Sequence, residues 1–380
     1  MRNIFPTFLL TALSSLLLSC STQGPDITDA EADERRETAL FAVDKEGAGE
    51  ITRFYEATTT LAQSEYEQAN DEMLGMPIDA LYEASGEQLW LHSNTLGKIV
   101  VLDLGTRQKR AELTGFPAGD TAALNGMAFS NYSQGWVIAY GAHNVFHIDV
   151  RNLVRVGSLP LPGNPTAITT NDQYDAGGDN VSRDNRVYVA IERADGTGEL
   201  VGFHSNDPDF IVEGIVEFPR PPFFIDVNPD GQFLVALMPG AETDDPGTFA
   251  IETDPTFYVV DLRADQIVFE RPFISPPLRN YVGLQPNFAT LTDDSFLYLA
   301  TPDGVIRLDT KAWGEYDYIF SGKSYSVIGA DYWTDLLYAV PTDAPNSVER
   351  ISKNGTGYSP LTLDNPVRSI RFVSTNRIVK

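Results

Sequence analysis

The sequence predicts an all-β fold assembled from a repeated four-stranded unit, and three observations lead to this conclusion. Short apolar segments recur roughly every 40–60 residues along the chain. A second apolar segment follows most of them, and it often ends in aspartate. The composition is 42% hydrophobic and rich in Val, Ile, Tyr and Phe, which are residues that favour strands.

The repeated segments define the units in chain order. The first segments are LWL at 89, WVIAY at 136, RVYVAI at 186, FLVAL at 233, FLYLA at 296, LLYAV at 336 and RIV at 377. The clearest second segments are KIVVLDL (98–104), NVFHIDV (144–150), TFYVVDL (256–262) and GVIRLDT (304–310). An apolar run precedes each first segment and another follows each second one, which makes four strands in each unit. We expect Asp44, Asp103, Asp149, Asp261 and Asp309 to cap the turn that follows the same strand of each unit.

Four strands in each such period are typical of a β-propeller blade. The last unit holds RIV and the run before it but lacks two strands, because the chain ends at Lys380. TALFAVD (38–44) and GEITRFYEA (49–57) match the two missing strands. The sequence therefore predicts a seven-bladed β-propeller of four-stranded antiparallel blades, with N- and C-terminal strands sharing one blade. Such closure removes the open sheet edges that promote aggregation.

The repeats resemble those of the YVTN type, in which a YVxN strand, a VxVID strand and an SPDG turn recur. LWLHSNTLGKIVVLDL (89–104) and VNPDGQFLVAL (227–237) carry the resemblance, which covers roughly residues 38–380. It implies a propeller domain. By analogy with YVTN-like surface lipoproteins, it also implies delivery of a small nutrient such as cobalamin to an outer-membrane transporter.

The first residues predict export. A basic start at Arg2 is followed by an apolar run from Ile4 to Leu18, the pattern of a secretory signal peptide. The Leu-Leu-Ser-Cys sequence that ends at Cys20 resembles the lipobox of bacterial lipoproteins. This resemblance implies that residues 1–19 are removed and that Cys20, the only cysteine of the chain, carries lipid. The predicted location is the bacterial cell envelope, as an outer-membrane lipoprotein that is periplasmic or surface-exposed.

Residues 20–37 form the predicted lipid anchor and an acidic, disordered tether, because they are rich in acids and offer little to bury. The whole chain has 27 basic and 53 acidic residues, a formal net charge of −26. Such a charge excludes nucleic acid as an expected partner, because the phosphate backbone would be repelled. The expected partners are the membrane, through the lipid on Cys20, and an outer-membrane protein or transporter.

Three segments are longer than the repeat requires, and propellers bind mainly through loops of this kind on one face. They are 58–77, 239–255 and 271–286, and the first has the pattern of a short amphipathic helix. We expect a ligand site on this face, with two histidines of neighbouring blades near the same central mouth. The candidate ligand-binding residues are Glu242, Asp244, Asp245, Arg279, Asn280, Tyr281, His92 and His143. The alternative is that these loops are solvated insertions.

One further insertion, residues 171–185, joins the first and second strands of its unit and therefore belongs to the opposite face. Its aspartates, with glycines between them, suit the oxygen coordination of calcium, although their spacing is not that of an EF-hand. The candidate metal ligands are Asp172, Asp175, Asp179 and Asp184. The alternative is a plain acidic hairpin, so calcium is the one cofactor that the sequence leaves open.

The sequence contains no motif of a catalytic site: Gly-x-Ser-x-Gly and phosphate-binding loops are absent. The function it favours is non-catalytic recognition of a partner protein or a small ligand at the envelope. The alternatives are a calcium-dependent hydrolase such as a lactonase, and a structural member of an envelope assembly. Carboxylates that converge at the centre of the ring would favour the hydrolase. A bowl lined by Tyr281, Arg279 and Phe116 would favour capture.

Overall fold

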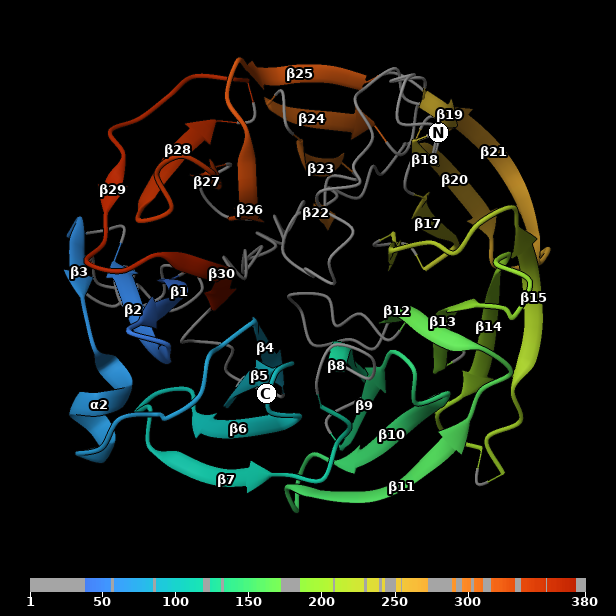
Figure 1. Cartoon of the computed structure of the whole chain (residues 1–380), viewed down its shortest axis with the longest axis horizontal. Helices are drawn as coiled ribbons and strands as arrows, with labels where there is room; N and C mark the ends of the chain where they lie inside the picture. Colours follow the sequence, from blue (N-terminus) through green and yellow to red (C-terminus); the bar gives the residue numbers. More distant parts are fainter. Residues whose placement is uncertain are drawn as a thin grey trace, which may run out of the picture.

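Seven four-stranded antiparallel sheets form a ring in the computed structural model (Figure 1). The prediction of a seven-bladed propeller is therefore confirmed. The structure describes residues 38–373 except for 56–57, 85–86, 119–123, 131–132, 172–184, 208, 229–230, 239–240, 243–250, 254, 273–288, 292–295, 302–303, 310–315, 332–335 and 353. In every blade the first strand lies nearest the axis and the fourth lies at the rim.

The strands are given for each blade from the axis outwards. Blade 1 contains β30 (Val367–Val373), β1 (Thr38–Lys45), β2 (Ala48–Tyr55) and β3 (Thr60–Ala62). Blade 2 contains β4 (Ala80–Ala84), β5 (Gln88–Ser93), β6 (Lys98–Asp103) and β7 (Lys109–Leu113). Blade 3 contains β8 (Leu124–Ser130), β9 (Gln134–Ala139), β10 (Asn144–Asp149) and β11 (Val154–Pro160). Blade 4 contains β12 (Asn164–Thr170), β13 (Arg186–Glu192), β14 (Gly198–His204) and β15 (Glu213–Phe218).

The remaining blades follow the same order. Blade 5 contains β16 (Phe224–Val227), β17 (Phe233–Met238), β20 (Thr256–Asp261) and β21 (Gln266–Pro272). Blade 6 contains β22 (Ala289–Leu291), β23 (Phe296–Thr301), β24 (Gly304–Asp309) and β25 (Tyr316–Ser321). Blade 7 contains β26 (Tyr325–Ala330), β27 (Leu336–Pro341), β28 (Ser347–Ser352) and β29 (Leu361–Thr362). An additional hairpin of β18 (Ala241–Glu242) and β19 (Ile251–Thr253) lies between β17 and β20.

The terminal blade closes the ring as predicted, but it divides differently between the two chain ends. β1 pairs with β2 on one side and directly with β30 on the other. The blade therefore takes three strands from the N-terminal part and one from the C-terminal part, and the expected division of two and two is wrong. TALFAVD is a second strand rather than a third, and RIV (377–379) lies outside the described residues.

The second and third strands of a blade, such as β5 and β6, are buried on both faces because each blade packs between two others. In β5, Leu89 and Leu91 belong to the core shared with blade 1, whereas Trp90 belongs to the core shared with blade 3. The Trp90 side chain is fully buried, and its indole N–H donates to Gln88 at 3.0 Å. Gln88 in turn donates to the carbonyl of Val150 in blade 3 at 3.1 Å. Such bonds fix one blade against the next without leaving the indole N–H unsatisfied.

The predicted aspartate caps are present at the turns that the structure describes in full. Asp103 accepts hydrogen bonds from the backbone N–H groups of Gly105 and Thr106, and Asp149 and Asp261 do the same in their own turns. Asp44 caps Gly47 in the same manner, but it ends a second strand and not a third. Its turn therefore lies at the opposite face of the ring from the turn of Asp103.

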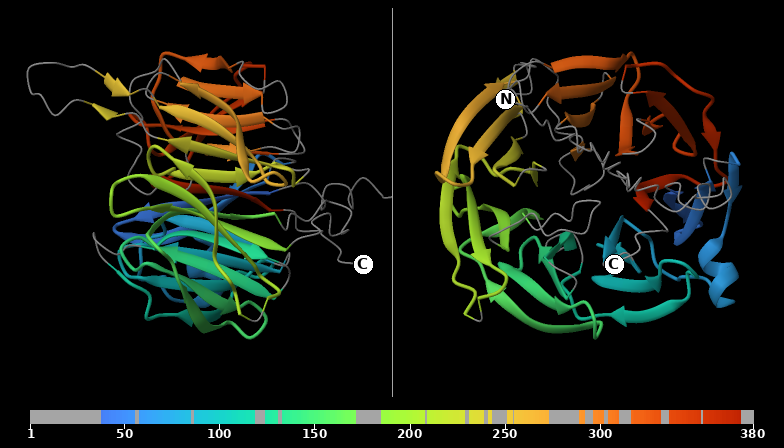
Figure 2. Two further views of the ribbon diagram at one scale, coloured as in Figure 1. Left: turned by 90° about the vertical axis from the view of Figure 1, so that its right-hand side faces the viewer. Right: turned by 180° about the vertical axis from the view of Figure 1, so that it is seen from behind.

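The two faces carry different features. The β18–β19 hairpin leaves the ring at the face where second strands turn into third strands, and Figure 2 (left) shows it projecting from that side. We name this the hairpin face. Thr38 pairs with Val373, and both residues lie at the other end of their strands. The described chain therefore begins and ends at the same face, which we name the terminal face.

The 58–77 segment contains the expected helix, α2 (Glu65–Asn70), but it does not extend over the centre of the ring. Figure 1 places α2 at the rim, between blade 1 and blade 2. Tyr66, Leu74 and Met76 are buried in the core shared by these blades. Glu50 of β2 accepts hydrogen bonds from the N–H groups of Tyr66 and Glu67 at the helix start. The segment therefore joins two blades rather than adding to a binding face.

Candidate functional site

Most of the predicted site residues lie outside the described residues. These are the four aspartates of the 171–185 insertion (Asp172, Asp175, Asp179 and Asp184), together with Asp244, Asp245, Arg279, Asn280, Tyr281 and Cys20. Glu242 lies in β18, where its backbone pairs with Ile251. Their predicted roles in ligand, calcium and lipid binding stay predictions. Among the described residues, no group of three or more His, Cys, Asp or Glu side chains is placed to hold a metal ion.

The two candidate histidines do not face a common mouth. His143 is exposed in the turn between β9 and β10, with a backbone φ of 52°. His92 is only 1% exposed, and neither of its ring nitrogens has a hydrogen-bond partner. Its ring packs edge-on against Tyr82 at 6.1 Å between centroids. Burial lowers the pKa of His92 to about 3, so the ring is neutral at ordinary pH.

Phe116 does not line a binding bowl either. Its side chain is 6% exposed and belongs to the core shared by blades 2 and 3. The Phe146 ring meets it edge-on at 5.5 Å, and the guanidinium of Arg155 lies 5.8 Å from its centroid. The expectation that Phe116 contributes an aromatic wall to a binding mouth is therefore wrong. Its neighbours show that it holds two blades together.

The structure instead places polar side chains together on the innermost strands. We name these four residues the axial cluster: Tyr82 of β4, Thr169 of β12, Asp226 of β16 and Arg371 of β30. The Thr169 hydroxyl donates to the Asp226 carboxylate at 3.0 Å, a bond between blades 4 and 5. The Arg371 charge reaches both Asp226 and Tyr82 from blade 1, and it lowers the pKa of each. Blades far apart in the ring thus contribute to one polar region.

The electrostatics of the axial cluster depend on Asp226. Burial raises the pKa of Asp226 to about 6, although hydrogen bonds from Thr169 and from the Val227 N–H, and the Arg371 charge, all act in the opposite direction. The side chain is half-buried, whereas Arg371 is exposed. Solvent therefore reaches this region even though it lies on the innermost strands. Above about pH 6 the cluster presents a carboxylate and a guanidinium together.

One polar atom near the axis is buried without a partner among the described residues. The Tyr82 hydroxyl is also buried, which raises its pKa well above the usual range, while the Met127 N–H acts in the opposite direction. Asn125 of β8 is 6% exposed and donates to the carbonyls of Pro165 and Thr166, but its Oδ1 accepts nothing. An unmade hydrogen bond at a buried polar atom costs about 1–3 kcal/mol. A polar ligand or an ordered water molecule would recover this cost.

The sequence carries a signal for this region. Asp226 lies within the apolar segment FFIDVNPDG (223–231), and Arg371 lies within SIRFV (369–373). Asp226 is the single charge of its innermost strand, and Arg371 lies between Ile370 and Phe372 in a strand that also contains Arg368. A charged side chain in such a strand is rare unless it is paired. The charges mark two positions of interest, but only the closed ring brings them near each other.

Comparisons with known proteins support the fold and leave the function open. No protein-family model matches the chain, and no curated protein matches it. A Desulfotomaculum acetoxidans protein of unknown function superposes with a TM-score of 0.60 at 11% identity, covering 89% of this chain and 98% of that one. A Bacteroides fragilis protein provisionally named a 6-phosphogluconolactonase gives 0.59 at 11% identity, with 89% and 98% covered.

A third structure is more distant. Hydrazine synthase from Kuenenia stuttgartiensis gives a TM-score of 0.55 at 12% identity, covering 77% of this chain and 88% of the other. At such identities the likeness shows the propeller fold alone. Propellers support unrelated functions, so the function has to be argued from the residues of this chain.

Proposed function

We propose that this protein is a lipid-anchored binding module of a bacterial cell envelope, and that its axial cluster captures a small polar ligand. One observation carries the proposal: Asp226 and Arg371 have opposite charges, act on each other near the axis, and are reached by solvent. Charged groups on innermost strands are costly unless they are paired or used. Here they come from blades 1 and 5, so their electrostatic interaction depends on the closed ring.

The chemistry of the cluster indicates the class of ligand. Arg371 offers a planar set of N–H donors that suits a carboxylate. Asp226 accepts hydrogen bonds from an ammonium or amide group when it is ionised, and the Thr169 hydroxyl holds it in place. A small zwitterion, such as a free amino acid or a short peptide, presents both complementary charges. We therefore expect a dipolar ligand rather than a simple cation or anion.

Capture accounts for the described residues better than hydrolysis does. A calcium-dependent hydrolase needs several carboxylates around one metal ion. Asp226 is the only carboxylate in the axial cluster, and the Arg371 charge beside it would oppose a divalent cation. The calcium-binding insertion predicted from the sequence lies outside the described residues, so the hydrolase remains the alternative that the experiment must also address.

The test is a binding screen on the full chain. Thermal-shift measurements with free amino acids and dipeptides, followed by calorimetric titration, should give at least one saturable ligand. Asp226→Asn and Arg371→Gln should each weaken its binding at least ten-fold, whereas Arg151→Gln, an exposed arginine of a surface turn, should leave it unchanged. The absence of any saturable ligand would reject axial capture. Lactone hydrolysis that requires calcium would establish the hydrolase instead.

The lipid anchor has its own test. Cys20→Ala should move the protein from the membrane fraction to the soluble fraction, because the acyl chains on that residue supply the membrane affinity. No helix in the described part of the chain is long and apolar enough to cross a membrane. A Cys20→Ala chain that stays fully in the membrane fraction would disprove the anchor. Washing with high salt distinguishes lipid anchoring from electrostatic adsorption.

A further inference from the structure

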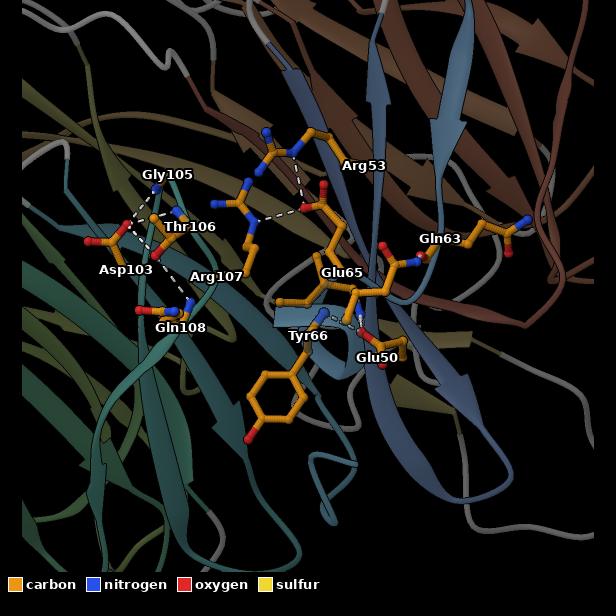
Figure 3. A network of polar contacts seen from close by, with 12 residues as sticks. Glu50, Arg53, Gln63, Glu65, Tyr66, Asp103, Gly105, Thr106, Arg107 and Gln108 are labelled. Atoms are coloured by element: carbon orange, nitrogen blue, oxygen red, sulfur yellow. Dashed lines mark hydrogen bonds and ion pairs between the residues drawn. The ribbon is translucent and has the colours of Figure 1, made fainter. Parts of the chain in front are cut away.

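The rim between blade 1 and blade 2 contains a second charged site, separate from the axis. Figure 3 shows α2 in this seam, with Arg53 of β2 and Arg107 of the β6–β7 turn on either side of Glu65. The Arg53 Nε lies 3.0 Å from Glu65 Oε2, and the Arg107 Nε lies 2.9 Å from the same oxygen. We name these three residues the seam cluster.

The seam cluster has more positive charge than its carboxylate can balance. The side chains are strongly buried: Arg107 is 2% exposed, Arg53 10% and Glu65 13%. Burial, and then the charge of Arg53, lower the pKa of Arg107 to about 10, so it remains protonated at neutral pH. Two guanidinium groups therefore share one carboxylate. Glu50, the other buried carboxylate at the start of α2, accepts hydrogen bonds from the helix N–H groups.

The unused hydrogen-bond donors belong to Arg107. Its Nη1 and Nη2 atoms are buried and have no partner, although its Nε donates to Glu65. Figure 3 shows one of these nitrogens pointing toward the Arg53 guanidinium and the other pointing away from it. Such donors usually bind a carboxylate or a phosphate oxygen, because the planar fork matches two oxygens at once. Their geometry thus fits an anion that the protein itself does not supply.

The backbone holds Arg107 in this position. Its φ is 62°, a left-handed conformation that non-glycine residues seldom adopt. Its N–H donates to the Asp103 carbonyl at 2.9 Å, and its own carbonyl accepts from the Asn70 side chain at 3.0 Å. The Asp103 side chain fixes the same turn through Gly105. The arginine is therefore built into the seam by both blades, and it cannot easily swing into solvent.

Tyr55 contacts the seam cluster through Arg53. The Arg53 Nη1 donates to the Tyr55 hydroxyl at 3.1 Å, and the guanidinium lies 5.4 Å from the centroid of the phenol ring. The side chain is 37% exposed, so it can move at little cost. Tyr55 is also the cross-strand neighbour of Thr38, where the described chain begins at the terminal face. The site therefore lies beside the entry of the predicted tether to the membrane.

We propose that the seam cluster binds a phosphate group, which Arg53 and Arg107 hold between their guanidinium groups after the Tyr55 phenol has moved aside. The group would be free phosphate or the headgroup of a membrane phospholipid, since both present the same oxygens. The guanidinium forks would supply paired N–H donors, and the second negative charge would balance the second arginine. This site is independent of the axial cluster, so the failure of one proposal leaves the other standing.

The first arm of the test is calorimetric titration of the full chain with inorganic phosphate at constant ionic strength. Saturable binding to one site is expected. Arg107→Lys should weaken it at least ten-fold, because lysine keeps the charge but loses the planar fork. Arg151→Lys, in an exposed turn, is the matched control and should not change the affinity. Asp226→Asn should also leave it unchanged, which separates this site from the axial one.

Tyr55→Phe keeps the test valid if Arg107→Lys does not fold. It removes only the hydroxyl that accepts a hydrogen bond from Arg53 Nη1. That donor then becomes available, so phosphate should bind at least three-fold more tightly. The second arm is co-sedimentation of the unlipidated Cys20→Ala chain with phosphatidylcholine vesicles, with or without phosphatidylglycerol. Binding that needs both phosphatidylglycerol and Arg107 would identify a headgroup as the source. The proposal is overturned if neither arm shows binding, if Arg107→Lys binds as wild type does, or if Tyr55→Phe gains no affinity.

Discussion

The axial cluster and the seam cluster both combine arginine with a carboxylate, but the two regions handle charge in different ways. At the axis, Arg371 is exposed and Asp226 is half-buried, so solvent and ligands reach both charges. At the seam, Glu65 sits between two arginines that are at most 10% exposed. The charged groups at the axis can exchange hydrogen-bond partners with solvent, whereas those at the seam help to join two blades. The same residue types are therefore open to solvent in one place and buried between two blades in the other.

This difference in burial has an energetic consequence. A buried ion pair gains little over an apolar contact, but removing one partner leaves an uncompensated charge in a medium of low dielectric constant. This penalty applies fully at the seam, because both guanidinium groups depend on one Glu65 oxygen. At the axis, ionised Asp226 itself lowers the stability of the folded chain. Replacing it with an uncharged side chain should therefore raise the stability. Substitutions in the two regions should thus change stability with opposite signs.

The largest expected effect is the loss of Glu65. Glu65→Gln should destabilise the chain by about 3–5 kcal/mol, because it leaves two buried guanidinium groups without a counter-charge. Urea unfolding at pH 7.5 measures the change. Glu67→Gln is the matched control on the same helix: its partner Lys45 is 2.6 Å away, but these side chains are 42% and 32% exposed. That variant should lose no more than about 1 kcal/mol.

Equal losses of stability in Glu65→Gln and Glu67→Gln would show that the seam cluster contributes no more than an exposed ion pair. A small loss in both would mean that solvent compensates the arginines, and the contrast with the axis would disappear. A large loss for Glu65→Gln that added phosphate partly restores would tie the stability of the seam to its proposed anion site.

The fold was predictable because its determinants repeat. Alternating apolar strands recur around the ring, and aspartates such as Asp103 and Asp149 cap the same turn in successive blades. The division of the terminal blade was not predictable from the same pattern. RIV at the chain end has the pattern of a strand. The strand that belongs to blade 1, however, is the one that pairs with β1, and this is β30. A pattern identifies a strand, and only register identifies its neighbours.

The sites were less predictable because they depend on long-range contacts. Asp226 and Arg371 come from strands in blades 1 and 5, and Arg53 meets Arg107 only because α2 bridges the seam. The analysis of loops favoured residues such as His92, which lies at the end of a strand. Packing against Tyr82 buries that histidine completely. Sequence position indicates the face on which a residue lies, but it does not indicate its burial.

The smaller effect is expected at the axis, where Asp226→Asn should stabilise the protein in the absence of ligand. The folded-state pKa of Asp226, about 6, is above the ordinary value of 3.8, so the folded chain binds the proton more tightly. The wild type therefore loses stability as pH rises through this window, and the loss is complete above about pH 6. After a discount for solvent access, Asp226→Asn should gain about 1–2 kcal/mol at pH 7.5 and nothing below about pH 4.

The measurement is chemical unfolding of wild type and Asp226→Asn at pH 4, 5.5 and 7.5, and the quantity of interest is their difference. His92 titrates with the opposite sign: its folded-state pKa of about 3 lies below the ordinary value of 6.5, so stability falls as pH falls through that window. Both chains keep His92, so its contribution cancels in the difference. A difference that does not change with pH would show that solvent already screens Asp226. The axis would then lack the costly charge that distinguishes it from the seam.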